Sequence, residues 1–285
     1  MDIARREEIT TLNYKLGNKT MKNINGLYSV HLELTSRCNK DCWMCGRRKI
    51  DREYPEIAID YGDIDFELVA KIARQLPEGI VVQFHNNGEP LLYPRFGEAV
   101  KLFENQIKCT DTNGKLLLKK ADEIIDNLDT LTISVIQNDP DADEQYEIVK
   151  KFLDLKKERK PLMIFRCLGN VDIGRWEKLG GTIATRILHD PLGSFKYQKP
   201  PTIPEIGICL EILNHMAINQ FGKVSVCVRF DPEGLGIIGD ANAEPLVDIW
   251  NSPKRIEWKR YHIEGKRHKI PLCSYCHYWG VPTGS

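Results

Sequence analysis

The sequence has no apolar run long enough to cross a bilayer, for which a helix needs about 20 such residues. It also lacks an excess of charge, because 40 Lys and Arg residues balance 40 Asp and Glu residues. A neutral chain offers no broad basic face to nucleic acid. Residues 5–8 are charged and no apolar segment follows them, so we expect no secretory signal. These absences predict a cytoplasmic protein that binds neither membranes nor nucleic acid.

Cysteine, by contrast, is abundant, with nine in 285 residues. Nine is an odd number, and a cytoplasmic chain does not pair its thiols as disulfides, so metal binding is the better explanation for most of them. A chain of this length can bury one large core and carry a smaller second domain. Residues 254–269 are locally basic, which we interpret as a solvated helix face.

Three cysteines, Cys38, Cys42 and Cys45, form a C-x3-C-x2-C pattern directly after alternating apolar residues at 30, 32 and 34. A loop that leaves a buried strand can turn three thiolates toward one point. Three thiolates satisfy three irons of a four-iron cluster and leave the fourth iron open to a ligand. A zinc ion with a fourth ligand from elsewhere, or three buried apolar thiols, would also explain the pattern.

This stretch resembles the cluster loop of the radical S-adenosylmethionine (SAM) enzymes, which follows the first strand of a partial barrel. The resemblance implies a [4Fe–4S] cluster on the three cysteines, with SAM on the open iron. The family usually has an aromatic residue just before the third cysteine. Here Met44 has that position and Trp43 precedes it, so the resemblance implies a contact between Met44 and SAM.

Apolar alternation predicts strands at residues 29–35, 80–85, 107–112, 130–135, 161–167 and 182–188. Helical spacing of apolar residues between them is clearest at residues 66–73 and 148–155. This alternation indicates an α/β fold with parallel strands and helical crossovers. Together with the cysteine loop, it resembles the partial (β/α)6 barrel of the radical SAM family. We expect that barrel at residues 27–199, after an N-terminal arm at residues 1–26.

Three further sequence features of the family lie at or just after the ends of the second, third and fourth predicted strands. Asn87-Gly88-Glu89 stands where the family has Gly-Gly-Glu, which hydrogen-bonds the methionine ammonium of SAM. A carbonyl contact survives the Asn replacement, because any residue supplies a carbonyl. Residues 112–114, Thr-Asn-Gly, have the family's placement, and the resemblance gives Ser134 a contact with the ribose or carboxylate of SAM. Without the family, these would be two ordinary turns and a strand serine.

Polar residues near predicted strand ends are candidates for catalysis and substrate contacts. The predicted catalytic residues are Arg166, His85 and His189. Arg166 ends the fifth predicted strand, where a guanidinium could bind a carboxylate of SAM or substrate. Asn86, Asp190 and Arg229 are further polar candidates, and an ordinary surface position is the alternative for each. Cys109 and Cys167 lie in strand patterns, and we interpret both as core thiols.

Three prolines within residues 200–204 predict a stiff linker, so we place a second domain at residues 200–285. That domain contains Cys209, Cys227, Cys273 and Cys276, and residues 218–227 read as a hairpin. A hairpin and a distant C-x2-C pair can fold together around a metal. The four thiolates suit structural zinc as well as a four-iron cluster.

The four cysteines and residues 246–251 resemble the auxiliary-cluster tail of the SPASM/Twitch radical SAM enzymes. The resemblance implies a second [4Fe–4S] cluster held by Cys209, Cys227, Cys273 and Cys276. The longer SPASM tail has further cysteines for another cluster, and none follows Cys276 here. We therefore expect a small Twitch-like domain with one auxiliary cluster.

The resemblance implies reductive cleavage of SAM to a 5′-deoxyadenosyl radical, which abstracts hydrogen from the substrate. An auxiliary cluster fully ligated by cysteine suits electron transfer, as in the radical aminocyclitol dehydrogenases, which oxidise a secondary alcohol. We therefore expect an oxidoreductase that acts on a small sugar- or aminocyclitol-like molecule. Its electrons would come from an external donor of the flavodoxin or ferredoxin type.

Other functions remain compatible with the pattern. A peptide maturase usually has a leader-recognition domain, and the arm at residues 1–26 is too short to supply one. A sugar decarboxylase or epimerase is a further alternative, and an epimerase would need a hydrogen donor such as Cys109 or Cys167. Outside catalysis, the chain could be an iron–sulfur sensor or a zinc-stapled binding module. Neither of these needs a SAM site at residues 87–89.

Overall fold

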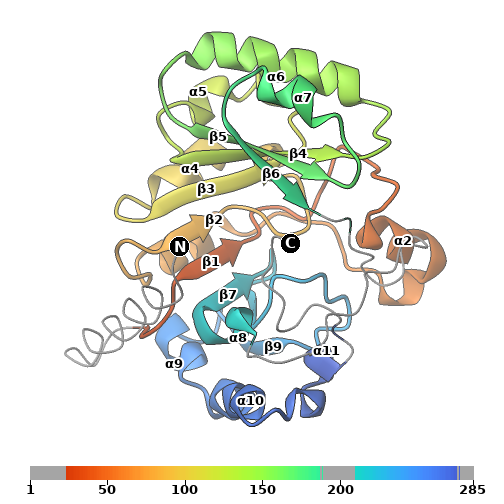
Figure 1. Ribbon diagram of the computed structural model, residues 1–285. Helices are drawn as coiled ribbons and strands as arrows, with labels where there is room; N and C mark the ends of the chain where they lie inside the picture. Colours follow the sequence, from red (N-terminus) through yellow and green to blue (C-terminus); the bar gives the residue numbers. More distant parts are fainter. Residues whose placement is uncertain (1–23, 187, 189–208, 275, 277–285) are drawn as a thin grey trace.

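The computed structural model describes residues 24–186, 188, 209–274 and 276 (Figure 1). Nearly all of the expected N-terminal arm and the expected domain boundary after residue 199 lie outside these residues. Within the described ranges, no helix combines the length and the apolar composition that a membrane crossing requires.

A single nine-stranded sheet, in the order β6-β5-β4-β3-β2-β1-β7-β8-β9, organises the described chain. Its first six strands are β1 (Ser29–Leu32), β2 (Val81–Gln83), β3 (Ile107–Thr112), β4 (Thr130–Ile136), β5 (Leu162–Leu168) and β6 (Thr182–Arg186). Each pairs in parallel with the next one along the chain. All six predicted strands are therefore present.

The first strand is shorter than the predicted 29–35, because the backbone after Leu32 changes its partners. The amide of Glu33 donates to the carbonyl of Ile218 at 2.9 Å, and that of Ser36 donates to Gly62 at 2.9 Å. Residues 33–36 thus lead away from β2 and toward the loop that carries the first three cysteines.

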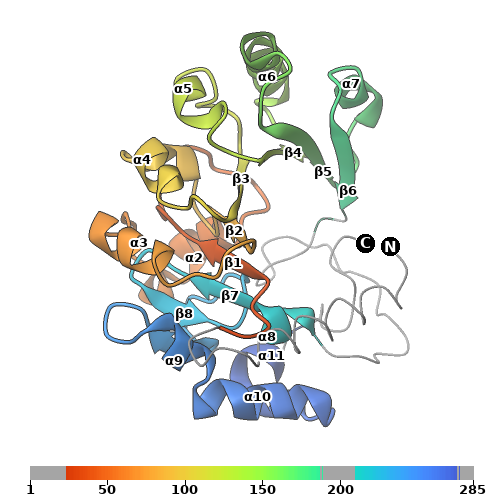
Figure 2. The same cartoon turned by 90° about the vertical axis from the view of Figure 1, so that its left-hand side faces the viewer.

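Helices cover one face of the parallel strands, and Figure 2 shows α3 to α7 following the curve of β2 to β6. They are α3 (Phe66–Ala73), α4 (Phe96–Lys101), α5 (Ala121–Ile124), α6 (Ala142–Lys156) and α7 (Ile173–Glu177). The predicted helices at residues 66–73 and 148–155 are confirmed. In α3 the spacing of buried Leu68, Val69 and Ile72 gives one apolar face, and the Asp65 carboxylate caps the helix by accepting from the Leu68 amide at 3.0 Å.

The C-terminal part extends the same sheet through β7 (His215–Ile218), β8 (Lys223–Ser225) and β9 (Ile237–Asp240). Strand β7 pairs in parallel with β1 and in antiparallel fashion with β8, which confirms the predicted hairpin. Around it lie α8 (Leu210–Asn214), α9 (Leu246–Trp250), α10 (Pro253–Ile263) and α11 (Pro271–Ser274) (Figure 1). The pairing of β7 with β1 joins the C-terminal cysteines to the barrel strands.

The loops after β1 and β2 are packed directly against each other. The amide of Glu89 donates to the carbonyl of Arg37 at 2.7 Å, and the backbone of Gly88 lies against Thr35. A Cβ at Gly88 would lie 2.0 Å from the carbonyl oxygen of Thr35. Glycine is required here for close backbone approach and not for an unusual dihedral angle.

The Glu89 side chain is buried between the ends of β2 and β3. Its carboxylate accepts hydrogen bonds from the Thr112 hydroxyl at 2.8 Å and from the amides of Asn113 and Leu91 at 2.8 and 3.1 Å. Burial nevertheless raises the pKa of Glu89 to about 7 from its usual 4.5, although these donors oppose the rise. The carboxyl group therefore fixes the loop geometry and does not point to solvent.

Substituting Gly88 with Ala should destabilise the protein by about 3 kcal/mol, because the obstructing atom is backbone and cannot rotate away. The matched control is Gly62→Ala, where an added Cβ has no atom within 4 Å, and we expect a change below about 0.5 kcal/mol. Thermal and urea unfolding under anaerobic conditions measure both. Equal losses at the two positions would contradict this account of Gly88.

The pKa of Glu89 predicts a pH dependence of stability. Between pH 4.5 and about 7 the folded state keeps a proton that the unfolded chain releases, so the unfolding free energy falls as pH rises. Because Glu89→Gln is uncharged at every pH, the wild type should lose about 3 kcal/mol more than this variant across that range. Glu98→Gln, at an exposed carboxylate, should keep the wild-type slope, and identical slopes in all three proteins would refute the shift.

Candidate functional site

The loop between β1 and α2 (Gly46–Glu53) carries Cys38, Cys42 and Cys45, all partly exposed. All nine cysteines of the chain lie among the described residues and none is in a disulfide. Burial raises the pKa of Cys42 to about 12, and the nearby Cys38 and Cys45 contribute to this rise. The three thiols therefore share one region, and a cationic metal centre there would favour thiolate forms.

Contacts with α2 and with the segment that follows β4 (Thr130–Ile136) hold this loop in place. Arg48 of α2 donates to the carbonyl oxygens of Cys38 and Lys40 at 3.0 and 3.2 Å. The buried Lys40 ammonium pairs with Asp139 beyond the end of β4. The Trp43 indole donates to the carbonyl of Gln137 at 2.8 Å, while Met44 is half-buried in the turn before Cys45. The contact of Met44 with SAM stays a prediction.

The three residues predicted to bind the SAM ammonium lie beside this loop. The amide of Asn87 donates to Glu33 at 3.0 Å, and Gly88 and Glu89 pack against residues 35–37 as described above. Asn113, directly after β3, approaches from the other side. Its side-chain nitrogen Nδ2 is 4.0 Å from the Cys38 sulfur and donates to Asn39 Oδ1 at 2.8 Å. Asn87, Gly88 and Glu89 are thus brought to the cysteine loop, and their contact with SAM stays a prediction.

Arg166 and His85 meet at a buried carboxylate that the sequence reasoning did not single out, Asp111 on β3. Arg166 of β5 forms an ion pair with Asp111, the His85 ring nitrogen Nε2 is 3.3 Å from it, and the Gln83 amide donates to it at 2.7 Å. An acidic residue inside an otherwise buried strand pattern was the available signal. Ser134 is the register partner of Arg166, so both side chains face the same side of the sheet.

Burial controls the charges in this group. It lowers the pKa of His85 to about 3, with help from the nearby Arg166 cation, so the imidazole is neutral. It also lowers the pKa of Arg166 to about 10, with Arg186 contributing, which leaves the guanidinium charged near neutral pH. Both nitrogens of the His85 ring are engaged, because Gln83 lies 3.2 Å from Nδ1. A neutral His85 ring with both nitrogens engaged can therefore hold the Asp111 and Gln83 side chains in place.

The remaining candidate, His189, lies outside the described residues, as does Asp190. A different histidine, His31 of β1, lies between His85 and His215 of β7. Its ring centroid is 5.7 Å from that of His85 and 5.8 Å from that of His215, which in turn contacts Glu211 at 2.7 Å. The sequence reasoning named neither His31 nor His215, because nothing local marks a strand histidine as inward-facing.

The four C-terminal cysteines also gather in one region. Cys209 precedes α8, Cys227 follows β8, Cys273 lies in α11 and Cys276 follows it. Burial raises the pKa of Cys273 to about 12, and Cys209 and Cys276 add to the rise. Burial likewise raises the pKa of Cys227, with Cys209 among the contributors. The thiols thus act on one another across three segments of sequence.

Two side chains support this second set. The His262 ring nitrogen Nε2 is 3.4 Å from the sulfur of Cys273, and Arg267 donates to the carbonyls of Cys273 and Cys276 at 2.5 and 3.3 Å. Within the described ranges, no three His, Cys, Asp or Glu side chains converge as ligands of a single metal ion do. Cysteine thiolates are the donors that a [4Fe–4S] cluster takes, so both sets suit a cluster in donor type.

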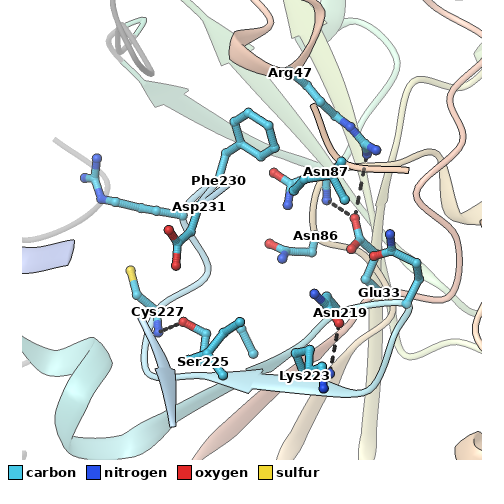
Figure 3. A pocket seen from close by; sticks show the side chains of 15 residues that line it. Glu33, Arg47, Asn86, Asn87, Asn219, Lys223, Ser225, Cys227, Phe230 and Asp231 are labelled. Carbon is cyan, nitrogen blue, oxygen red and sulfur yellow. Dashed lines mark hydrogen bonds and ion pairs between the residues drawn. The ribbon is translucent and has the colours of Figure 1, made fainter. Parts of the chain in front are cut away.

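A solvent-open pocket with a cavity volume of about 50 Å³, or about 500 Å³ when the adjoining open space is counted, lies between the barrel and the C-terminal hairpin (Figure 3). Its polar lining includes Glu33, Arg47, Asn86, Asn87, Asn219, Lys223, Ser225, Cys227, Arg229 and Asp231. The barrel contributes residues next to the first cysteine loop, and the hairpin contributes Cys227 of the second set. Of the weaker sequence candidates, Asn86 and Arg229 face this pocket.

Two family models match the chain. Residues 32–168 match the radical SAM superfamily, and residues 209–277 match SPASM, an iron–sulfur cluster-binding domain. The first match covers the loop of Cys38, Cys42 and Cys45, and the second covers the four C-terminal cysteines.

Curated relatives agree with these matches. The chain is 24% identical over 269 residues to an S-adenosyl-L-methionine-dependent 2-deoxy-scyllo-inosamine dehydrogenase of Niallia circulans, covering 89% of this chain and 94% of the relative. It is 33% identical over 112 residues to a tungsten-containing aldehyde ferredoxin oxidoreductase cofactor-modifying protein of Pyrococcus furiosus. That match covers 38% of this chain and 29% of the relative, so the chain spans less than a third of that protein.

Solved structures share the fold. BtrN in complex with AdoMet and 2-DOIA superimposes with a TM-score of 0.58 at 17% identity, covering 88% of this chain and 92% of BtrN. The anSMEcpe structure with bound AdoMet gives 0.55 at 12% identity, covering 90% of this chain and 84% of that one. The α/β fold predicted from the sequence is confirmed. The chain belongs to the radical SAM superfamily and carries a C-terminal SPASM domain, so it is a radical SAM enzyme with SAM and [4Fe–4S] clusters as cofactors.

Proposed function

We propose that the enzyme oxidises a secondary alcohol of a small, polar, sugar- or aminocyclitol-like substrate bound in the pocket of Figure 3. One observation carries the proposal: the pocket is bordered by Asn86 and Asn87, beside the first cysteine loop, and by Cys227 of the second thiol set. A substrate there lies between the two cysteine sets. The dehydrogenase relative, which matches this chain over most of both lengths, supports the same reaction class.

Cys38, Cys42 and Cys45 would hold the SAM-binding cluster, and Cys209, Cys227, Cys273 and Cys276 the auxiliary cluster. When bound, these groups and SAM would supply a hydrogen-atom acceptor and a one-electron acceptor for the substrate. The substrate loses a carbon-bound hydrogen atom, one electron and its hydroxyl proton, which together amount to a two-electron oxidation. An external flavodoxin- or ferredoxin-type donor would supply the electron that starts each cycle.

The chain's own residues would position the substrate and exclude water. Asn86, Asn87 and Asn219 offer amide groups to hydroxyl or amino substituents. The buried Arg166–Asp111 pair, held by His85 and Gln83, provides fixed charges on the inner face of the barrel strands. Rigid polar groups of this kind hold the reacting carbon in place, which matters because a hydrogen atom transfers only over a short distance.

Transfer of a labelled hydrogen tests the reaction class. Polyols and aminocyclitols, including 2-deoxy-scyllo-inosamine, would be deuterated at the carbinol carbon and incubated with reduced enzyme and SAM under anaerobic conditions. We expect deuterium in 5′-deoxyadenosine together with a ketone product, both detected by mass spectrometry. Labelled 5′-deoxyadenosine with a rearranged or epimerised product would favour the other radical reactions over dehydrogenation.

Substituting one cysteine of each set separates their roles. The wild type should bind about eight irons per chain, and Cys42→Ala and Cys273→Ala should each lose about four. Cys42→Ala should abolish SAM cleavage, whereas Cys273→Ala should still release some 5′-deoxyadenosine without turning over substrate. Cys109→Ala, at a core thiol, is the control and should keep all the iron. Full turnover by Cys273→Ala would refute electron transfer through the C-terminal set, and stoichiometric zinc there would make that set structural.

The contact between His262 and Cys273 predicts a change in reduction potential. A hydrogen bond from the imidazole to a ligating sulfur stabilises the more negative, reduced form of a cluster, so removing it lowers the potential. In a Cys42→Ala background, which leaves only the auxiliary cluster, His262→Phe should shift the midpoint potential down by on the order of 60 mV. His262→Gln should restore part of the shift. The exposed His268→Phe is the control, and equal potentials for His262→Phe and the parent would exclude the effect.

A further inference from the structure

Arg47 is a buried cation whose charged group lacks hydrogen-bond acceptors. It lies in the first turn of α2, and the residue is 5% exposed. Its Nε, Nη1 and Nη2 atoms have no hydrogen-bond partner. The guanidinium stacks over the Tyr61 ring at 4.5 Å, and Nη1 is 3.9 Å from Glu33, too far for a hydrogen bond. A buried guanidinium with unmet donors is costly, so this arrangement calls for an acceptor.

The side chain lines the pocket, and Figure 3 shows it reaching from α2 to the pocket edge beside Glu33. Planar guanidinium groups bind carboxylates and phosphates through two parallel hydrogen bonds. The Arg47 guanidinium lies over the Tyr61 ring, 4.5 Å from its centroid, and this contact limits its movement. A ligand in the pocket would therefore meet a cation already held at the pocket edge.

The carboxylates of the pocket already have other donors. Glu33 accepts from the amide of Asn87 at 3.0 Å. Asp231 accepts from the amides of Leu235 and Gly236 at 2.9 and 2.7 Å. These acids help to hold the pocket walls, and although Glu33 forms an ion pair with Arg47, neither acid accepts a hydrogen bond from the guanidinium. The pocket thus has surplus donors that an incoming oxyanion would satisfy.

We propose that Arg47 anchors an acidic group, a carboxylate or a phosphate, on the substrate of this enzyme. The inference rests on the proposed function, because it assumes that the pocket is the substrate site. Among small sugar- or cyclitol-like substrates, it favours those that carry a carboxylate or phosphate over neutral or amino polyols. The amides of Asn86 and Asn219 then remain for the hydroxyl groups.

Matched ligand pairs test the proposal by binding alone. The anaerobically reconstituted full chain, saturated with SAM, would be titrated calorimetrically with D-gluconate and sorbitol, and with D-glucose 6-phosphate and D-glucose. Each pair differs in an acidic group on a similar polyol skeleton. We expect at least one acidic member to bind ten times or more tighter than its neutral partner. Equal binding within both pairs, or no binding of any of the four, would overturn the proposal.

Variants assign the preference to Arg47. Arg47→Gln should remove the acidic preference, and Arg47→Lys, which keeps the charge without the fork, should keep part of it. Arg95→Gln is the matched control, because Arg95 also lies over an aromatic ring and pairs with a glutamate, but in an exposed position just before α4. It should bind all four ligands like the wild type. An unchanged preference in Arg47→Gln would overturn the assignment, with iron content and the Arg47→Lys result showing that the fold is intact.

The carboxylate of SAM is the competing acceptor, so SAM affinity is measured in the same variants. The proposal expects SAM affinity within about twofold of the wild type in Arg47→Gln. A tenfold or greater loss of SAM affinity with an unchanged probe preference would instead assign Arg47 to the cosubstrate. Release of 5′-deoxyadenosine is followed separately, so that failure of the radical chemistry is distinguished from failure of the anion site.

Discussion

The parallel pairing of β1 with β7 is the constraint on which the rest of the site depends. Strand β1 has β2 on one side and β7 on the other, so a single strand joins the barrel to the C-terminal hairpin. Residues that follow β1 lead to the first cysteine set, and residues that follow β7 and β8 lead to Cys227. The pocket lies where Glu33, directly after β1, faces residues of β7, β8 and the segments that follow them, because β7 lies next to β1. A tail attached to any other strand would separate the two thiol sets.

Burial of polar groups then shapes the site. Glu89, Asp111 and Lys40 are all nearly inaccessible, and each is held by partners from other strands or loops. Such satisfied groups make the loops around the cysteines rigid, because any shift would leave a buried charge without its partner. Arg47 is different, since its partner at hydrogen-bond distance is missing from the described residues. Arg47 still forms an ion pair with Glu33, so it is the unmet hydrogen-bond donors, and not an uncompensated charge, that separate this ligand site from the scaffold.

Several features could be predicted from local sequence. The spacing of Cys38, Cys42 and Cys45 after an alternating run predicted a cluster loop, and the six strands and the hairpin were found where the apolar pattern placed them. Other features could not be predicted. In the sequence, Asp111 is one polar residue in a strand. Only the structure shows that Arg166, His85 and Gln83 all contact its carboxylate. The Glu89 side chain likewise turned out to hold β3, because its partners, Thr112 and Asn113, are more than twenty residues away.

The sequence alone marked the thiols that bind metal, since their number and spacing are local properties of a short loop, and the resemblance to the radical SAM family favoured a [4Fe–4S] cluster over zinc. It also determined the strand order along the chain, because apolar periodicity is set residue by residue. The tertiary structure decided which strands are neighbours, and hence that β7 lies against β1 and that Cys227 borders the pocket. The tertiary structure also decided which buried polar groups have hydrogen-bond or ion-pair partners. Burial and long-range contacts set that balance, and no single stretch of sequence contains both partners.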